Sequence, residues 1–203
     1  MSDTKEAILI TALHLFAKEG YEAVSVSRIA GALEMTKGAL YKHYQSKRDI
    51  FDHIVLRMEE MDTRQAVKFE LPEGTVEEMK EKYRNVSIKR FADYCEAQFE
   101  YWTEDDFACS FRKMLTLEQF RSEEMQKLYQ QYLVAGPVEY VTELFGALGI
   151  RNYKEQASCL YAAMFFFYSM YDGAEDKKKI TAQFRKMLER LVESICNEEK
   201  GGQ

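Results

Sequence analysis

Residues 25–47 read SVSRIAGALEMTKGALYKHYQSK, and this stretch decides the fold. Ser25 and Thr36 each precede a short run with apolar residues at helical spacing. Both residue types are preferred at helix N-caps, because the side-chain oxygen accepts a backbone N–H. The two runs, 26–33 and 37–44, are separated by a turn of only two or three residues. Two short helices joined in this way are typical of a helix-turn-helix.

Longer helices are expected on both sides of this motif. Asp3 with Glu6 forms a carboxylate variant of the capping box at the start of a first helix. Gly20 supplies the left-handed residue that ends this helix. Ser46 with Asp49 forms a further capping box, which predicts the start of a fourth helix.

The rest of the chain also has a helical pattern, and its 203 residues include only 2 Pro and 10 Gly. The segment Leu71-Pro72-Glu73-Gly74 predicts a loop between an N-terminal head and a C-terminal body. We expect Pro137 to kink the third body helix. The body helices are expected near residues 75–102, 105–120, 122–146, 152–172 and 176–197.

Several classes of protein are disfavoured by what the sequence lacks. The chain shows no signal-peptide pattern, and its longest apolar run, from Cys159 to Tyr168, is too short to span a membrane. The 4 Cys are scattered, without disulfide or metal-ligand spacing. No G-x-S-x-G, HExxH or phosphate-loop motif is present. We therefore expect a soluble cytoplasmic protein that is not an enzyme, holds no metal or cofactor and contacts no membrane.

The net charge of −6 is unevenly distributed. Residues 1–50 carry 7 Lys/Arg against 6 Asp/Glu, whereas the remainder carries 21 against 28, so nucleic acid would meet only one end of the chain. On helix 37–44, Lys37, Tyr41 and Lys42 fall outside the apolar stripe. The backbone N–H groups at the start of this helix favour phosphate oxygens, and Gly38 permits a close backbone approach.

The head resembles the N-terminal domain of the TetR family of transcriptional regulators over about the first quarter of the chain. The pattern consists of Ile8, Ala12, Leu15-Phe16, Gly20-Tyr21, Ser25, Ile29-Ala30, Thr36, Gly38, Leu40-Tyr41, His43-Tyr44, Ser46-Lys47 and Ile50-Phe51. The resemblance implies that double-stranded operator DNA is contacted by Ser27, Arg28, Thr36, Lys37, Gly38, Ala39, Tyr41, Lys42, His43 and Lys47. His14 and His53 are interpreted as surface or packing residues.

Two positions depart from the family pattern. Leu33-Glu34 stands where the turn usually has a small residue followed by Gly, so the turn is expected to differ in register or angle. Arg28 stands where many members have an acid that closes a capping box with Ser25. Both a DNA-facing cation and a surface ion pair would explain Arg28.

The last two helices carry the strongest apolar patterns of the body. Residues 160–171 are apolar all round, which indicates burial on more than one side. The final helix has a clean apolar seam that includes Leu188 and Leu191. The family resemblance implies a homodimer in which two such helices from each subunit form a four-helix bundle. The alternative is that both helices are buried within one monomer.

Aromatic residues and Met are abundant in the middle helices and suit the lining of a cavity for a small, largely apolar effector. Plain core packing is the alternative for each of them. Carboxylates on the same helices leave a cationic effector open: Glu96, Glu100, Glu118 and Glu143. The candidate ligand-binding residues are Tyr94, Trp102, Phe111, Met114, Tyr132, Phe165 and Tyr168.

The sequence thus predicts an all-α protein with a three-helix helix-turn-helix DNA-binding domain (1–48) and a helical bundle domain for ligand sensing and dimerisation (49–203). We expect a sequence-specific transcriptional regulator, a repressor that a small effector releases from its operator. A helical small-molecule sensor or scaffold that does not bind DNA is the alternative.

Overall fold

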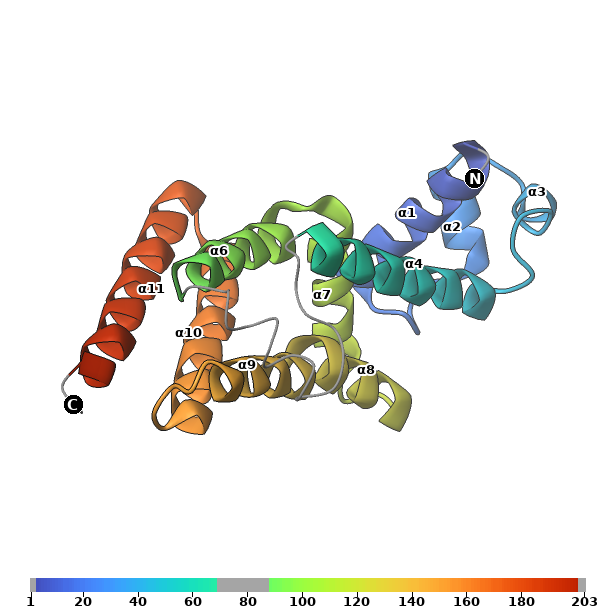
Figure 1. Ribbon diagram of the computed structural model, residues 1–203. Helices are drawn as coiled ribbons and strands as arrows, with labels where there is room; N and C mark the ends of the chain where they lie inside the picture. Colours follow the sequence, from blue (N-terminus) through green and yellow to red (C-terminus); the bar gives the residue numbers. More distant parts are fainter. Residues whose placement is uncertain (1–2, 69–87, 201–203) are drawn as a thin grey trace. The chain divides into compact units, whose positions relative to one another are not determined.

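The computed structural model describes residues 3–68 and 88–200, and the described residues form helices joined by turns, with no strand among them (Figure 1). This confirms the expected all-α fold. The helices are α1 (Asp3–Glu19), α2 (Val26–Ala32), α3 (Lys37–Leu40), α4 (Lys47–Lys68), α6 (Ile88–Glu104), α7 (Asp106–Glu118), α8 (Glu123–Leu133), α9 (Ala135–Ala147), α10 (Tyr153–Gly173) and α11 (Lys177–Lys200). None of these helices is long and apolar enough to cross a membrane.

The chain divides into two compact units. The first contains Met1–Lys68 and Asp105–Tyr129, so that α7 and most of α8 belong with α1 to α4; the second contains Phe69–Glu104 and Gln130–Gln203. The two units are defined by how the chain packs, whereas the expected domains were defined by function. The expected DNA-binding domain 1–48 and sensing domain 49–203 therefore stay predictions.

The first unit is built on α1, which packs against α2, α4 and α7. Leu13 and Phe16 of α1 are fully buried, as are Ile29 of α2 and Ile54 of α4. The predicted N-caps Ser25 and Thr36 and the predicted stop of the first helix at Gly20 are confirmed. Gly20 follows α1 with a φ of 85°, in the left-handed region where glycine is favoured.

The third helix is shorter than the expected 37–44. The α-helix covers Lys37–Leu40, and a turn continues it through His43. The backbone N–H of Lys42 donates to Ala39 at 3.2 Å and that of His43 donates to Leu40 at 2.9 Å. Both hydrogen bonds join residues three positions apart, as in a 3₁₀-helix, and they tighten the last turn.

The second unit contains α6, α9, α10 and α11. Its core is aromatic: Phe99 of α6 stacks on Phe184 of α11 at 4.2 Å and on Tyr168 of α10 at 5.6 Å. The expected helix 75–102 appears as α6, and residues 75–87 lie outside the described residues.

The expected kink in helix 122–146 is a complete break between α8 and α9. Val134 leaves the helical region with φ −138° and ψ −84°. Pro137 has no N–H to donate to the carbonyl of Leu133, four residues earlier. The Tyr161 hydroxyl of α10 donates to this carbonyl instead, at 2.7 Å. The break therefore leaves no buried carbonyl unsatisfied at Leu133.

Candidate nucleic-acid interface

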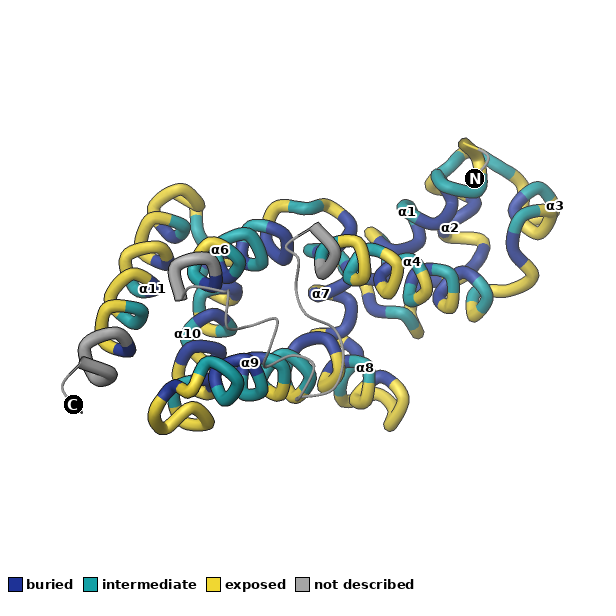
Figure 2. Tube along the Cα trace, in the orientation of Figure 1, coloured by how far each residue is buried: buried dark blue, intermediate teal, exposed yellow. Residues whose placement is uncertain are grey.

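The short helix α3 presents an exposed polar face at the edge of the first unit (Figure 2). The Thr36 hydroxyl accepts a hydrogen bond from the backbone N–H of Ala39 at 3.1 Å and caps the helix. Leu40 is fully buried and fixes the orientation of α3 against the core. With Leu40 turned into the core, Lys37 and Gly38 of this helix are exposed to solvent.

The predicted recognition residues lie on that face. Lys37, Gly38, Tyr41 and Lys42 are exposed, whereas Ala39 is half-buried. Within the part of the chain that the structure describes, the ammonium groups of Lys37 and Lys42 have no ion pair or hydrogen bond. These two cations can therefore bind an anion without first breaking a contact.

A second group of residues predicted to contact DNA lies at the start of α2. Ser25 accepts a hydrogen bond from the backbone N–H of Arg28 at 3.2 Å, as expected of the N-cap. Ser27 is exposed. The Arg28 guanidinium donates to a Glu19 carboxylate oxygen at 3.1 Å, so the ion pair that the sequence left open is present. An exposed pair of this kind is weak, and a phosphate can compete for the guanidinium.

Lys47 points inward at the start of α4. Its ammonium donates to the Tyr21 carbonyl at 2.8 Å, lies 4.0 Å from a Glu22 carboxylate oxygen and sits 4.1 Å from the centre of the Tyr21 ring. The side chain is only 23% exposed. A phosphate would have to share this ammonium with the turn that follows α1.

The aromatic and histidine residues after α3 mainly support the turn. Tyr44 is buried, donates to the Lys5 carbonyl at 3.2 Å, and meets the edge of His53 at 5.2 Å. Burial raises the pKa of Tyr44 to about 12. His43 is half-buried, and His53 lies 2.8 Å from the Asp49 carbonyl through Nδ1. His53 packs as expected, and His14 lies at the surface, 2.8 Å from Asp106.

The turn between α2 and α3 carries backbone strain. Glu34, where the family pattern usually has Gly, adopts a φ of 53°. Side chains rarely occupy this left-handed region because Cβ approaches the backbone. The Met35 N–H still donates to the Ala30 carbonyl at 3.0 Å, so the turn closes in spite of the substitution.

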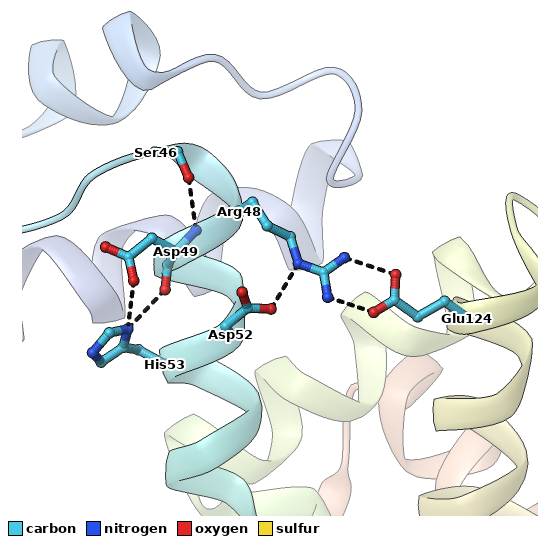
Figure 3. A network of polar contacts seen from close by, with 6 residues as sticks. All are labelled: Ser46, Arg48, Asp49, Asp52, His53 and Glu124. Carbon is cyan, nitrogen blue, oxygen red and sulfur yellow. Dashed lines mark hydrogen bonds and ion pairs between the residues drawn. The ribbon is translucent and has the colours of Figure 1, made fainter.

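Sequence reasoning missed Arg48, the residue after Lys47. Its guanidinium donates to both carboxylate oxygens of Glu124 on α8, at 2.7 and 2.5 Å, and to Asp52 at 2.7 Å (Figure 3). The hydrogen bond from Arg48 lowers the pKa of the Glu124 carboxyl group. Only the i,i+4 spacing of Arg48 and Asp52 is visible in the sequence, because Glu124 lies 76 residues away.

The predicted ligand-binding residues lie in both compact units. Two of them belong to the first unit and five to the second. Tyr168 stacks on Phe99 in the aromatic core, and Tyr94 meets Tyr140 at 6.3 Å. Phe111, Met114, Trp102, Tyr132 and Tyr168 are buried, and Tyr94 and Phe165 are half-buried.

Two of the four carboxylates that could serve a cationic effector, Glu96 and Glu100, form ion pairs within the protein. Arg185 of α11 forms ion pairs with Glu96 and, at 2.8 Å, with Glu100 of α6. In this structure a guanidinium already balances both charges. A cationic ligand at these carboxylates would have to displace it.

A family profile described as "Bacterial regulatory proteins, tetR family" matches residues 8–54, which contain the helix-turn-helix just described. The match to the TetR family is therefore to its N-terminal domain, over about a quarter of the chain, and the chain spans only about a third or less of the length of the curated relatives it matches. The similar proteins include the HTH-type transcriptional regulator AcrR of Shigella flexneri, 40% identical over 52 residues (26% of this chain and 24% of AcrR). The repressor BepR of Brucella suis is 35% identical over 74 residues, or 35% of each chain.

Solved structures share the fold over nearly the whole chain. The fatty acid degradation regulator FadR from Bacillus halodurans has a TM-score of 0.61 at 17% identity, over 95% of this chain and 96% of that one. A protein from Saccharomonospora viridis, described as a transcriptional regulator and solved in complex with choline, has a TM-score of 0.67 at 19% identity, over 95% and 97%. At these identities the likeness concerns the fold alone.

Proposed function

We propose that the protein is a sequence-specific DNA-binding transcriptional regulator that works in the cytoplasm. The observation that carries this proposal is the exposed surface of α3 and the turn after it, where Lys37 and Lys42 have no partner among the described residues and Tyr41 is exposed. This face lies in the region that matches the TetR family. A symmetric dimer would present two copies of α3, so the operator should be a pseudo-palindrome with half-sites about 34–36 Å apart.

The proposed contacts follow from the position of each residue. Lys37 and Lys42 would reach base edges in the major groove, where a lysine donates to guanine. The backbone at Gly38 and Ala39 would approach the groove closely. The remaining residues would bind phosphates and set the register: Ser27, Arg28, Thr36, Tyr41, His43 and Lys47.

Affinity measurements across salt concentrations would test this assignment. Fluorescence anisotropy with the gene's own upstream DNA and a scrambled duplex should show that Lys37→Ala loses roughly 1–3 kcal/mol of base discrimination. Tyr41→Phe should weaken binding without changing the salt slope, since it removes a neutral hydrogen bond.

Lys178→Ala, on the exposed surface of α11, is the matched control and should change neither property. Lys47→Ala completes the series on the proposed interface. Full operator affinity in the Lys37→Ala, Tyr41→Phe and Lys47→Ala variants would refute the recognition surface. No binding by the unmodified protein, even at low salt, would favour a sensor or scaffold that does not bind DNA.

A homodimer built on α10 and α11 is the second part of the proposal. Phe166 of α10 is 60% exposed, and Leu191 and Val192 of α11 are half-buried, so this region offers apolar surface to a partner. Leu188 is buried within the protomer and cannot report on the interface. We expect Phe166→Glu and Leu191→Glu to yield monomers in light scattering, with Lys186→Glu as the exposed control. A monomeric mass for the unmodified protein at micromolar concentration would refute the dimer.

A repressor role with release by a small, largely apolar effector is the third part. The choline complex of the S. viridis protein supports a fold that can hold a small molecule, and it adds a quaternary ammonium to the compounds worth screening. By linkage, an effector that weakens operator binding must itself be bound more weakly when DNA is present. Compounds that raise thermal stability while none shifts operator affinity would contradict this role.

A further inference from the structure

Arg48 is the exposed cation at the N-terminal end of α4. It directly follows the turn from α3, and its side chain is 51% exposed, whereas its neighbour Lys47 is held inward by the Tyr21 carbonyl. The guanidinium is nevertheless occupied: Nη1 and Nη2 donate to Glu124, and Nε donates to Asp52 (Figure 3).

The Glu124 carboxylate binds Arg48 as a phosphate would. A guanidinium offers two parallel N–H donors in a plane, and carboxylate and phosphate groups both accept them in a bidentate manner. One guanidinium fork cannot serve two such acceptors at once. A DNA phosphate at this end of α4 and the Glu124 carboxylate would therefore compete for the same two nitrogens.

We propose that Arg48 is a further phosphate-binding residue of the interface, which Glu124 withholds from DNA in the structure described here. This inference rests on the proposed DNA-binding function. The pair is exposed on both sides, with Glu124 47% exposed, so it is screened by salt and only weakly stabilising. A phosphate held close by the rest of the interface can displace Glu124.

The position of Glu124 makes this competition adjustable. Glu124 lies in the first turn of α8, which begins in the first unit and ends in the second. At its far end, the Leu133 carbonyl accepts the Tyr161 hydroxyl of α10. A shift of α8 would therefore change how firmly Arg48 is held.

The test compares two neighbouring acids on α8 in the full-length protein. Glu124→Gln frees Arg48, whereas Glu123→Gln removes the same charge from an exposed residue that pairs with Lys127 at 2.7 Å. With operator DNA, we expect Glu124→Gln to bind roughly three- to tenfold more tightly than Glu123→Gln. The slope of log K against log salt should steepen by about 0.9 for each half-site, as one more phosphate is contacted.

The same comparison in an Arg48→Gln background separates the contact from the charge. There, Glu124→Gln and Glu123→Gln should have equal affinities, because no guanidinium remains to be freed. Circular dichroism and thermal unfolding verify that each variant is folded.

Equal affinities of Glu124→Gln and Glu123→Gln in the Arg48 background would overturn the proposal while leaving DNA binding intact. Weaker operator binding by Glu124→Gln than by Glu123→Gln would also overturn the proposal, because the Arg48–Glu124 ion pair would then help to position α4 for binding. Absence of operator binding in every variant and in the unmodified protein would instead refute the proposed function.

Discussion

Replacement of Glu118 tests how the first unit is held together. Glu118 of α7 is 2% exposed, and its Oε1 accepts a hydrogen bond from the backbone N–H of Tyr21 at 3.0 Å. The carboxylate thereby satisfies a donor in the turn that follows α1. The contact joins segments 97 residues apart in the sequence.

The magnitude follows from this single buried contact. A hydrogen bond that involves a charged group contributes roughly 1.5–3 kcal/mol. Glu118→Ala removes it, leaves the Tyr21 N–H without this acceptor and opens a small cavity, so we expect a loss of about 3 kcal/mol in the free energy of unfolding. Glu118→Gln keeps a neutral oxygen acceptor of the same size, and we expect a loss of about 1 kcal/mol.

Urea unfolding followed by far-ultraviolet circular dichroism measures both losses. All variants are compared at one protein concentration, because association shifts apparent stability. Glu123→Ala, at an exposed position on α8, is the control and should lie within about 0.5 kcal/mol of the unmodified protein. A Glu118→Ala variant as stable as this control would refute the reasoning.

Three further outcomes are expected from the same unfolding measurements. Gly20→Ala should destabilise by at least about 1–2 kcal/mol, because φ is 85° and the new Cβ would lie 2.8 Å from a Glu118 carboxylate oxygen; no loss would contradict the left-handed turn. Glu34→Gly should stabilise by about 1 kcal/mol by relieving a φ of 53°, and a loss of stability would contradict this. Tyr44 favours its neutral form when folded, so stability should fall as the pH rises from about 10 to about 12, while the unfolded chain ionises first. Tyr44→Phe should show a smaller alkaline loss, and equal losses in both proteins would contradict the burial argument.

The helix N-caps at Ser25 and Thr36 and the helix stop at Gly20 were predictable because their signals are local. Ser25 and Thr36 each cap a backbone N–H three residues ahead, and Gly20 needs only its own conformational freedom. The α8–α9 break was only partly predictable. Pro137 predicts that the Leu133 carbonyl loses its helical donor. The donor that replaces it, the Tyr161 hydroxyl, comes from another helix and cannot be read from the local sequence.

The recognition residues illustrate the same limit at the candidate site. Helical spacing correctly places Lys37, Tyr41 and Lys42 outside the buried stripe, because one turn of helix fixes which side faces the core. The spacing does not predict the ion pair between Arg28 and Glu19, because an ion pair across a turn depends on the tertiary path of the chain.

Adjacent residues Lys47 and Arg48 show that a cation's availability is a property of the fold. Both lie in the first turn of α4, yet one ammonium binds the Tyr21 carbonyl and the next guanidinium binds a carboxylate 76 residues away. Lys37 at the start of α3 and Lys42 in the turn after it meet no such partner among the described residues. Cations that are free before DNA arrives can bind without breaking a contact, whereas held cations bind only after a competing acceptor leaves. Lys37 and Lys42 thus differ from Arg48, whose guanidinium is held by the Glu124 carboxylate of α8.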